Sequence, residues 1–151
     1  MVYDRTIEDV KEAREIVKSK IQKFLDLTEQ EIETLKRGFV TIDTLNRIED
    51  QQGKLKIILN EIGYHNTPII NKNWQYQDIF SEDDLNRIVQ NTITLKKAFF
   101  VFFDSPQNPT ARYYFDDFNR MEKILYDLED MSNRIKENYL ICGTFECGEV
   151  H

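Results

Sequence analysis

The stretch Ser81-Glu-Asp-Asp-Leu-Asn-Arg-Ile88 occurs in altered form at two other places in the chain. The other copies are Thr41-Ile-Asp-Thr-Leu-Asn-Arg-Ile48 and Tyr114-Phe-Asp-Asp-Phe-Asn-Arg-Met121. In each copy an Asp is followed, after one residue, by a large apolar residue, then by Asn, Arg and a second apolar residue. The copies begin 40 and 33 residues apart. A period of this length is typical of repeated supersecondary units.

The copies have the features of helix N-termini. In the second copy, Ser81 and Asp84 have the spacing of a capping box, in which two side chains satisfy backbone N–H groups at a helix start. The two apolar residues of each copy, and a Leu ten positions after the first of them, fall on one helical face. We expect these positions to form the core: Leu45, Ile48, Leu55, Leu85, Ile88, Leu95, Phe118, Met121 and Leu128.

Each copy also places an Arg four residues after an Asp, a spacing at which two side chains meet on a helix surface. The three pairs are Asp43 with Arg47, Asp83 with Arg87, and Asp116 with Arg120. Because a guanidinium presents a fork of N–H donors, we expect these Arg to bridge neighbouring helices through carboxylates and carbonyls. The alternative is a binding surface with three sites. We favour the architectural interpretation.

Helical patterns extend over most of the chain, and few Gly and Pro interrupt them. The sequence predicts an all-α fold, an elongated bundle of four to five helices in a domain of residues 1–139 that contains the three Asn-Arg repeats. The expected helices are one capped by Thr6 with an apolar stripe from Val10 to Leu25, one from Thr28 to a left-handed stop at Gly38, one over about 42–62 that stops at Gly63, one in the second repeat, and one over about 115–138.

The pattern changes after residue 139. Residues 140–151 alternate in places and contain Gly143 and Gly148, which is typical of an extended strand. A strand attached to a helical body needs a partner for its edges. We therefore expect a C-terminal arm that adds to a sheet of a neighbouring protein, with Phe145 in a pocket of the acceptor.

Two aromatic features invite a functional interpretation. Residues 63–80 lack helical periodicity and contain Trp74. This residue could anchor a binding partner or stack on a sugar, or it could fill the gap between two repeat helices; we favour the last interpretation. The run Ala98–Phe103 contains four Phe, including Phe100 and Phe103. That is more apolar surface than one face of a monomeric helix buries, so we expect part of it in an intermolecular interface.

Composition bears on the class of partner. The net charge is −7 and the basic residues are dispersed among acids, which argues against a nucleic-acid face. The longest apolar run is far shorter than the roughly 20 residues of a bilayer span, so we expect no membrane partner. The N-terminal residues lack the apolar segment of a secretory signal.

A few residue types in the chain could support chemistry at a site. Cys142, Cys147, His65 and His151 include zinc-binding residue types, but their spacing is not diagnostic and buried thiols are the simpler interpretation. The adjacent Asp pairs at 83–84 and 116–117 are explained by helix capping rather than by a glycosidase site. We expect no catalytic residue, no metal and no cofactor.

Four features together resemble a family of phage and phage-tail-like structural proteins from low-GC Gram-positive bacteria. They are the three repeats, the segment Trp74-Gln-Tyr-Gln-Asp78, the ending Cys142-Gly-Thr-Phe-Glu-Cys-Gly-Glu149, and the opening Tyr3-Asp-Arg-Thr-Ile-Glu-Asp-Val10. The resemblance covers nearly the whole chain. It implies a non-enzymatic component of a tail, baseplate or fibre-attachment region.

This resemblance also implies a location and partners. The protein is expected in a virion or tail-like particle assembled in the host cytoplasm, as a homo-oligomer in contact with other tail or baseplate proteins. The alternative is a soluble helical adaptor or host-interaction module outside the particle. An enzyme that acts on the cell wall is a more distant third.

Overall fold

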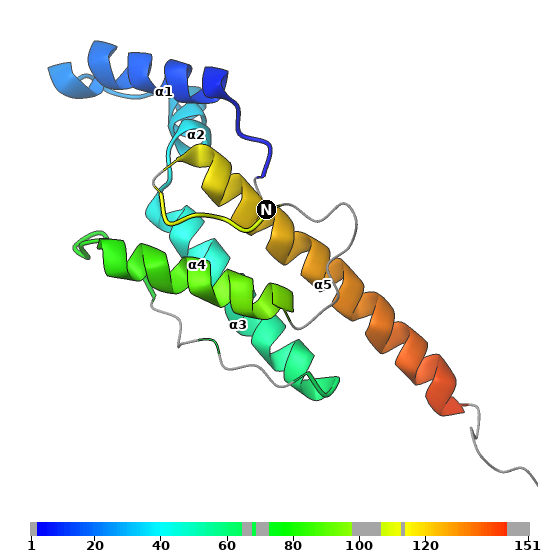
Figure 1. The fold of residues 1–151 in the computed structure, drawn as a ribbon. Coiled ribbons are helices and arrows are strands. Elements are labelled where there is room, and N and C mark those ends of the chain that lie inside the picture. The colour runs from blue at the N-terminus through cyan, green and yellow to red at the C-terminus, as the bar shows by residue number, and fades with distance from the viewer. Residues whose placement is uncertain (1–2, 65–67, 69–72, 98–106, 113, 145–151) are drawn as a thin grey trace, which may run out of the picture.

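The computed structural model describes residues 3–64, 68, 73–97, 107–112 and 114–144, with the backbone alone for residues 139–144. Within this part of the chain all regular structure is helical, so the all-α prediction is confirmed. The elements are α1 (Ile7–Ser19), the 3-10 turn η1 (Ile21–Lys23), α2 (Glu29–Gly38), α3 (Ile42–Glu61), α4 (Glu82–Lys97) and α5 (Phe115–Thr144). Helices α3, α4 and α5 form a body, and α1 and α2 form a hairpin at one end of it (Figure 1).

The body has one apolar core, to which all three helices contribute. Each of the nine apolar positions expected from the sequence is at most 5% exposed. Trp74, Val89, Ile124 and Leu125 join the same core. The core thus places the starts of α3, α4 and α5 side by side, and with them the polar residues of the three copies.

Capping boxes begin four of the helices. The predicted pair Ser81 with Asp84 exchanges hydrogen bonds, as do Thr6 with Asp9 and Thr28 with Glu31 at the two expected helix starts. Thr41 and Thr44 do the same at the start of α3. The backbone N–H of Thr6 lowers the pKa of Asp9, and the ammonium of Lys20 lowers the pKa of Glu31. Both carboxylates are therefore stabilised in their charged form.

The first helix is shorter than its apolar stripe suggested. It ends at Ser19, and the backbone N–H of Leu25 donates to the carbonyl of Lys20 at 3.0 Å, which turns the chain back toward α2. An ion pair between Lys20 and Glu31 closes this turn at 2.7 Å. Phe24 consequently has the left-handed φ of 55° and is 97% exposed.

The two predicted glycine stops differ in their physical role. Gly63 has a φ of 89°, as a left-handed stop requires. Gly38 has no positive φ; α1 and α2 instead approach closely there. A Cβ on Gly38 would lie 2.4 Å from the Cβ of Ala13 and 2.4 Å from the carbonyl oxygen of Asp9.

The C-terminal helix is longer than expected. α5 continues to Thr144, so the prediction of an extended conformation was wrong for residues 140–144. The residues from 139 to 142 contain neither Gly nor Pro, so no local signal ends the helix where its amphipathic pattern weakens. The rest of the predicted arm, with Phe145, lies outside the described residues. So does the aromatic run with Phe100 and Phe103.

Replacement of Gly38 by Ala should destabilise the hairpin, because the added methyl group meets backbone atoms of α1 that cannot move independently. We expect a cost of roughly 1–3 kcal/mol, measured as lost hydrogen-exchange protection of amides in residues 7–38. Glu33→Ala, on the exposed surface of the same helix, is the control. Equal protection in the two variants would contradict the close approach.

Candidate functional site: two buried carboxylate clusters

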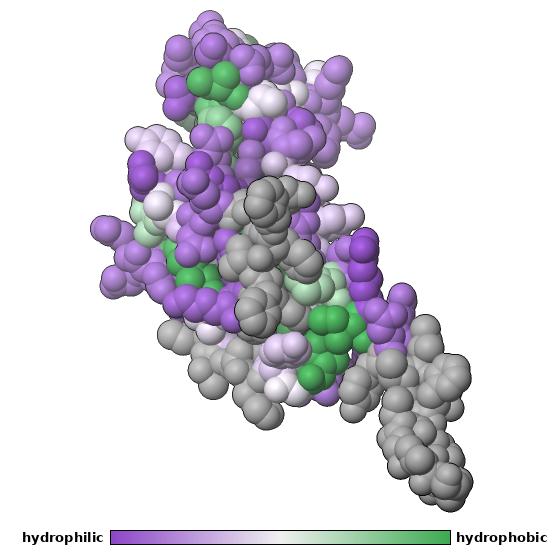
Figure 2. All heavy atoms as spheres, turned by 45° about the vertical axis from the view of Figure 1, so that its right-hand side comes forward, coloured by the Kyte–Doolittle hydropathy of each residue, from purple (hydrophilic) through white to green (hydrophobic). Residues whose placement is uncertain are grey.

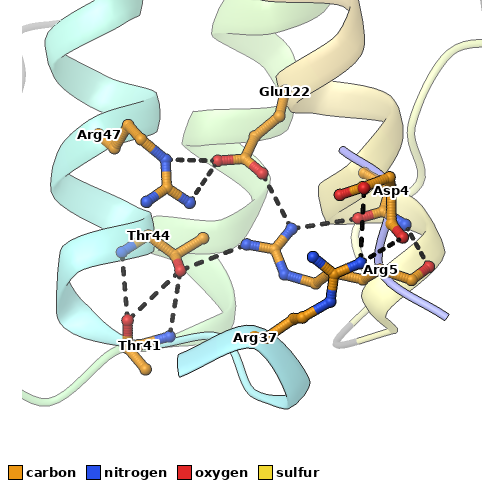
Figure 3. Close-up of polar contacts among 8 residues, drawn as sticks. Asp4, Arg5, Arg37, Thr41, Thr44, Arg47 and Glu122 are labelled. Carbon is orange, nitrogen blue, oxygen red and sulfur yellow. Dashed lines mark hydrogen bonds and ion pairs between the residues drawn. The ribbon is translucent and has the colours of Figure 1, made fainter. Parts of the chain in front are cut away.

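The buried carboxylate of Glu122 on α5 binds two Arg from different parts of the chain. Arg5, in the extended segment before α1, donates to it from one terminal nitrogen at 2.9 Å. Arg47 on α3 donates from Nε at 2.7 Å and forms an ion pair through a second nitrogen at 2.6 Å. The side chains of Glu122 and Arg5 are at most 1% exposed. Figure 3 shows both guanidinium groups directed at this carboxylate.

A second buried carboxylate, that of Glu49, has the same function between α3 and α4. Arg87 on α4 forms an ion pair with it. The indole N–H of Trp74 donates to its other oxygen at 2.7 Å. Glu49 is fully buried, so both donors act where water does not compete. Carboxylates that are hydrogen-bonded in this way offset the cost of their burial.

The two clusters occupy equivalent positions of the repeat. Glu49 and Glu122 each lie four residues after the first apolar residue of their copy. Each receives the Arg of a neighbouring copy, so that Arg47 binds Glu122 and Arg87 binds Glu49. The second copy has Val89 at this position. Its helix α4 therefore supplies an Arg to this arrangement but no equivalent carboxylate.

The Asn of two copies holds an extended segment of the chain. Asn46 accepts a hydrogen bond from the backbone N–H of Trp74 at 2.7 Å and donates to its carbonyl at 3.1 Å. Asn119 donates to the carbonyl of Arg5 at 2.9 Å and accepts from its guanidinium at 3.1 Å. In both places the held residue then donates to the buried Glu. Asn86, the corresponding residue of α4, is exposed.

The acids predicted to pair with the Arg are not their partners. Asp43, Asp83 and Asp116 are the second residues of their helices and are exposed to solvent. Where an Arg of the repeat meets an acid of its own helix, the spacing is three rather than four. These contacts are Arg87 with Asp84 at 3.7 Å and Arg120 with Asp117 at 3.4 Å. The decisive carboxylates lie on neighbouring helices.

Trp74 lies inside the body. It is 2% exposed, and its ring packs edge-on against Phe80 with centroids 5.2 Å apart. Because its backbone is held by Asn46 and its N–H by Glu49, the indole is not available to stack on a ligand. Trp74 is held against α3 by Asn46 and Glu49 and belongs to the core of the body, which agrees with a structural role rather than with ligand binding.

Sequence reasoning missed the residues that organise the two clusters: Arg5, Glu49 and Glu122. A signal was present, since the repeat carries a Glu at the same position in two of its three copies. A further polar contact was also missed. Gln52 of α3 is buried and donates to the carbonyl of Ile88 at 2.8 Å and to the hydroxyl of Thr92 at 2.9 Å.

Other features of the described residues give little indication of chemistry. An open cleft lies between α2 and the start of α3, but Arg37, Arg47 and Asp43 on its walls carry both signs of charge. No three His, Cys, Asp or Glu side chains in this part of the chain are grouped closely enough to hold a metal ion. None of its helices has both the length and the apolar character that a membrane span requires.

Replacement of Glu122 by Gln should destabilise the body strongly, because Arg5 would remain buried without its counter-charge. We expect a loss of roughly 3–5 kcal/mol in urea unfolding followed by fluorescence of Trp74, the single Trp. Asp130→Asn is the control, since Asp130 pairs with Arg134 on the exposed surface of the same helix and such pairs contribute about 1 kcal/mol or less. Similar losses in both variants would contradict the role of Glu122.

Replacement of Arg87 by Met tests the second cluster. The buried carboxylate of Glu49 loses a charged donor, so we expect a cost of roughly 1–3 kcal/mol. Lys97→Met, at the exposed end of the same helix, should leave the midpoint of thermal unfolding nearly unchanged. Equal melting temperatures for the two variants would mean that Arg87 does not hold α4 on α3.

Comparison with known proteins adds no family, because no family model, no curated protein and no solved structure matches this chain.

Proposed function

We propose that this chain is a non-enzymatic structural component of a bacteriophage tail or phage-tail-like particle, which assembles at the baseplate or fibre-attachment region. The assignment to a particle is supported by the sequence resemblance of the repeats and the two chain ends. The observation that supports the structural role is that two Arg of the repeat, Arg47 and Arg87, bind buried carboxylates of neighbouring helices. Arg5, from the segment before α1, binds one of the same carboxylates.

The architectural role follows from where the charges are. A catalytic acid or base must reach a substrate from a cleft, whereas Glu49 and Glu122 are fully buried among donors of the same chain. These carboxylates therefore bind donors of neighbouring segments inside the protein rather than a substrate. Helices joined in this way suit a protein that holds other proteins in place rather than one that catalyses a reaction.

The proposed attachment to neighbouring tail or baseplate proteins uses helical packing and the segment after Thr144. α5 projects past the other helices of the body (Figure 1), so whatever follows it starts away from the core. We infer that residues 145–151, with Phe145, bind an acceptor in a neighbouring protein. The particle would be assembled in the host cytoplasm.

The proposal is tested with purified particles from a host that encodes this chain. We expect mass spectrometry to detect the protein at a fixed ratio to the tail-tube protein. A variant that ends at Thr144 should remain folded and helical but should be lost from particles, whereas Lys97→Met should be incorporated normally. Absence of the full chain from particles would overturn the proposal and favour the alternative, a soluble helical adaptor or host-interaction module.

The enzyme alternative has its own test. Addition of the purified protein to a suspension of host cell walls should leave the turbidity unchanged over hours, with lysozyme as the positive control. A steady fall in turbidity that Asp83→Asn or Asp116→Asn abolishes would contradict a structural role, since these exposed carboxylates would then act on a substrate.

A further inference from the structure

In the part of the chain that the structure describes, the hairpin of α1, η1 and α2, residues 7–38, is bonded to the body only through its two ends. They are the segment before α1, residues 3–6, and the connection after α2, residues 39–41. Among these described residues, no hydrogen bond or ion pair runs directly from the hairpin to α3, α4 or α5, and the hairpin does not contribute to the apolar core of the body. An open cleft lies between α2 and the start of α3. The position of the hairpin therefore depends on its two ends.

The segment before α1 contacts the body through two alternate side chains, those of Tyr3 and Arg5. Arg5 donates to Glu122 at 2.9 Å, and its side chain is 1% exposed. The ring of Tyr3 lies against that of Tyr126, with centroids 5.5 Å apart, and the ammonium of Lys123 lies 5.3 Å from the centroid of the Tyr3 ring. Because Glu122 and Tyr126 are four residues apart, Tyr3 and Arg5 bind one face of α5.

The side chains between them contact the hairpin, because successive side chains of an extended segment point to opposite sides. Asp4 forms an ion pair with Arg37 of α2 at 3.4 Å, and Arg37 also binds Asp9 of α1 at 2.7 Å. Thr6 accepts a hydrogen bond from the backbone N–H of Asp9 as the N-cap of α1. In Figure 3, Arg5 is directed into the body while Asp4 meets Arg37. One short segment thus binds the body on one side and the hairpin on the other.

The hairpin has contacts of its own that do not involve the body. An ion pair between Lys20 and Glu31 closes its turn at 2.7 Å, and its two helices approach closely where Gly38 meets Ala13. Both helices begin with capping boxes. Its surface at the upper end of the molecule is mostly hydrophilic in Figure 2. These contacts stay in place if the segment before α1 leaves α5, so the hairpin can move without unfolding.

We propose that residues 3–6 are a latch. While Tyr3 and Arg5 are bound to α5, the hairpin is fixed on the body. When they leave α5, the folded hairpin turns about Phe39. This residue lies between the end of α2 and Val40, which packs against the core of the body, and a hinge of a few such residues is enough for a folded unit to move.

The open state is compatible with the buried charges. Glu122 keeps Arg47 as its counter-charge, and the guanidinium of Arg5 enters water, where it is solvated. Opening therefore costs the contacts of the latch and leaves the core of the body intact. A partial opening of this kind requires less free energy than unfolding of the whole chain.

The first experiment measures the position of the hairpin. Spin labels are attached to Glu12→Cys on α1 and Asn133→Cys on α5, both exposed positions, in a background without Cys142 and Cys147. Pulsed electron paramagnetic resonance should give one narrow distribution of distances between the two labels. That result would mean that the latch is closed in most molecules.

In the same labelled chain, Arg5→Met should replace the narrow distribution by a broad one, with the helix content unchanged in circular dichroism. Asn119→Ala removes two hydrogen bonds of the latch but keeps the ion pair of Arg5. It therefore leaves no buried charge unpaired, and it should add a broad component to the narrow one. Arg134→Met, which removes an exposed ion pair with Asp130 on α5, should keep the narrow distribution.

The second experiment uses Arg5 itself as the probe, in a chain with no substitution. Trypsin cleaves after Arg where the backbone opens, and the rate follows the population of the opened form. We expect cleavage after Arg5 before cleavage after Arg14, which is exposed but lies in α1, because the hairpin stays helical when the latch opens. Cleavage after Arg47 in α3 should be slower still than cleavage after Arg5, since it requires opening of the body.

A disulfide provides the matched control for this experiment. In a background without Cys142 and Cys147, Tyr3→Cys and Tyr126→Cys replace two rings that are in contact. Oxidation should join the latch to α5 and suppress cleavage after Arg5, and reduction should restore the cleavage.

Three outcomes would overturn the inference. The first is a single narrow distribution in both Arg5→Met and Asn119→Ala. The second is cleavage after Arg14 as fast as after Arg5, which would mean that the hairpin unfolds rather than turns. The third is cleavage after Arg5 that the disulfide leaves unchanged. Opening of the latch does not depend on a place in a tail particle, so its failure would leave the proposed function standing, and the reverse also holds.

Discussion

The body of this protein depends on the burial of one carboxylate, that of Glu122. Transfer of a single charge from water into a protein interior costs several kcal/mol or more, and this cost is offset only when the charge is paired and hydrogen-bonded. Arg47 and Arg5 do both, and they come from α3 and from the segment before α1. One carboxylate thus fixes three parts of the chain relative to one another.

The same arrangement recurs at Glu49, where Arg87 and Trp74 take the places of Arg47 and Arg5. In each cluster one donor comes from a helix and the other from an extended segment held by an Asn. A complete buried ion pair often adds little net stability compared with well-packed apolar residues, so we interpret the two clusters as contacts that specify the arrangement of the helices. Burial of the apolar core drives the helices to pack. The two clusters define which helices pack together and how they are aligned along their axes.

The hairpin of α1 and α2 follows a different physical rule. Its helices begin with well-formed capping boxes, yet only Ala13 and Gly38 are buried. Local signals make it helical without giving it a core. A segment with strong local structure and little burial is where opening costs least free energy, and it is also where a partner gains most by covering apolar surface.

The sequence by itself determined the features that depend on neighbours along the chain. Capping at Thr6, Thr28 and Ser81, the left-handed stop at Gly63, and the apolar face of each repeat all follow from spacings within one helical turn or a few turns. Tertiary structure alone decided which carboxylates the Arg bind. Asp43 lies four residues before Arg47, at the spacing of a helix pair, but the carboxylate that Arg47 binds is that of Glu122, 75 residues away. The same holds for Gly38, whose role depends on α1 at close range. Periodicity reports which face of a helix is buried, but the partner of a buried charge depends on which helix packs against that face, and no local pattern encodes that.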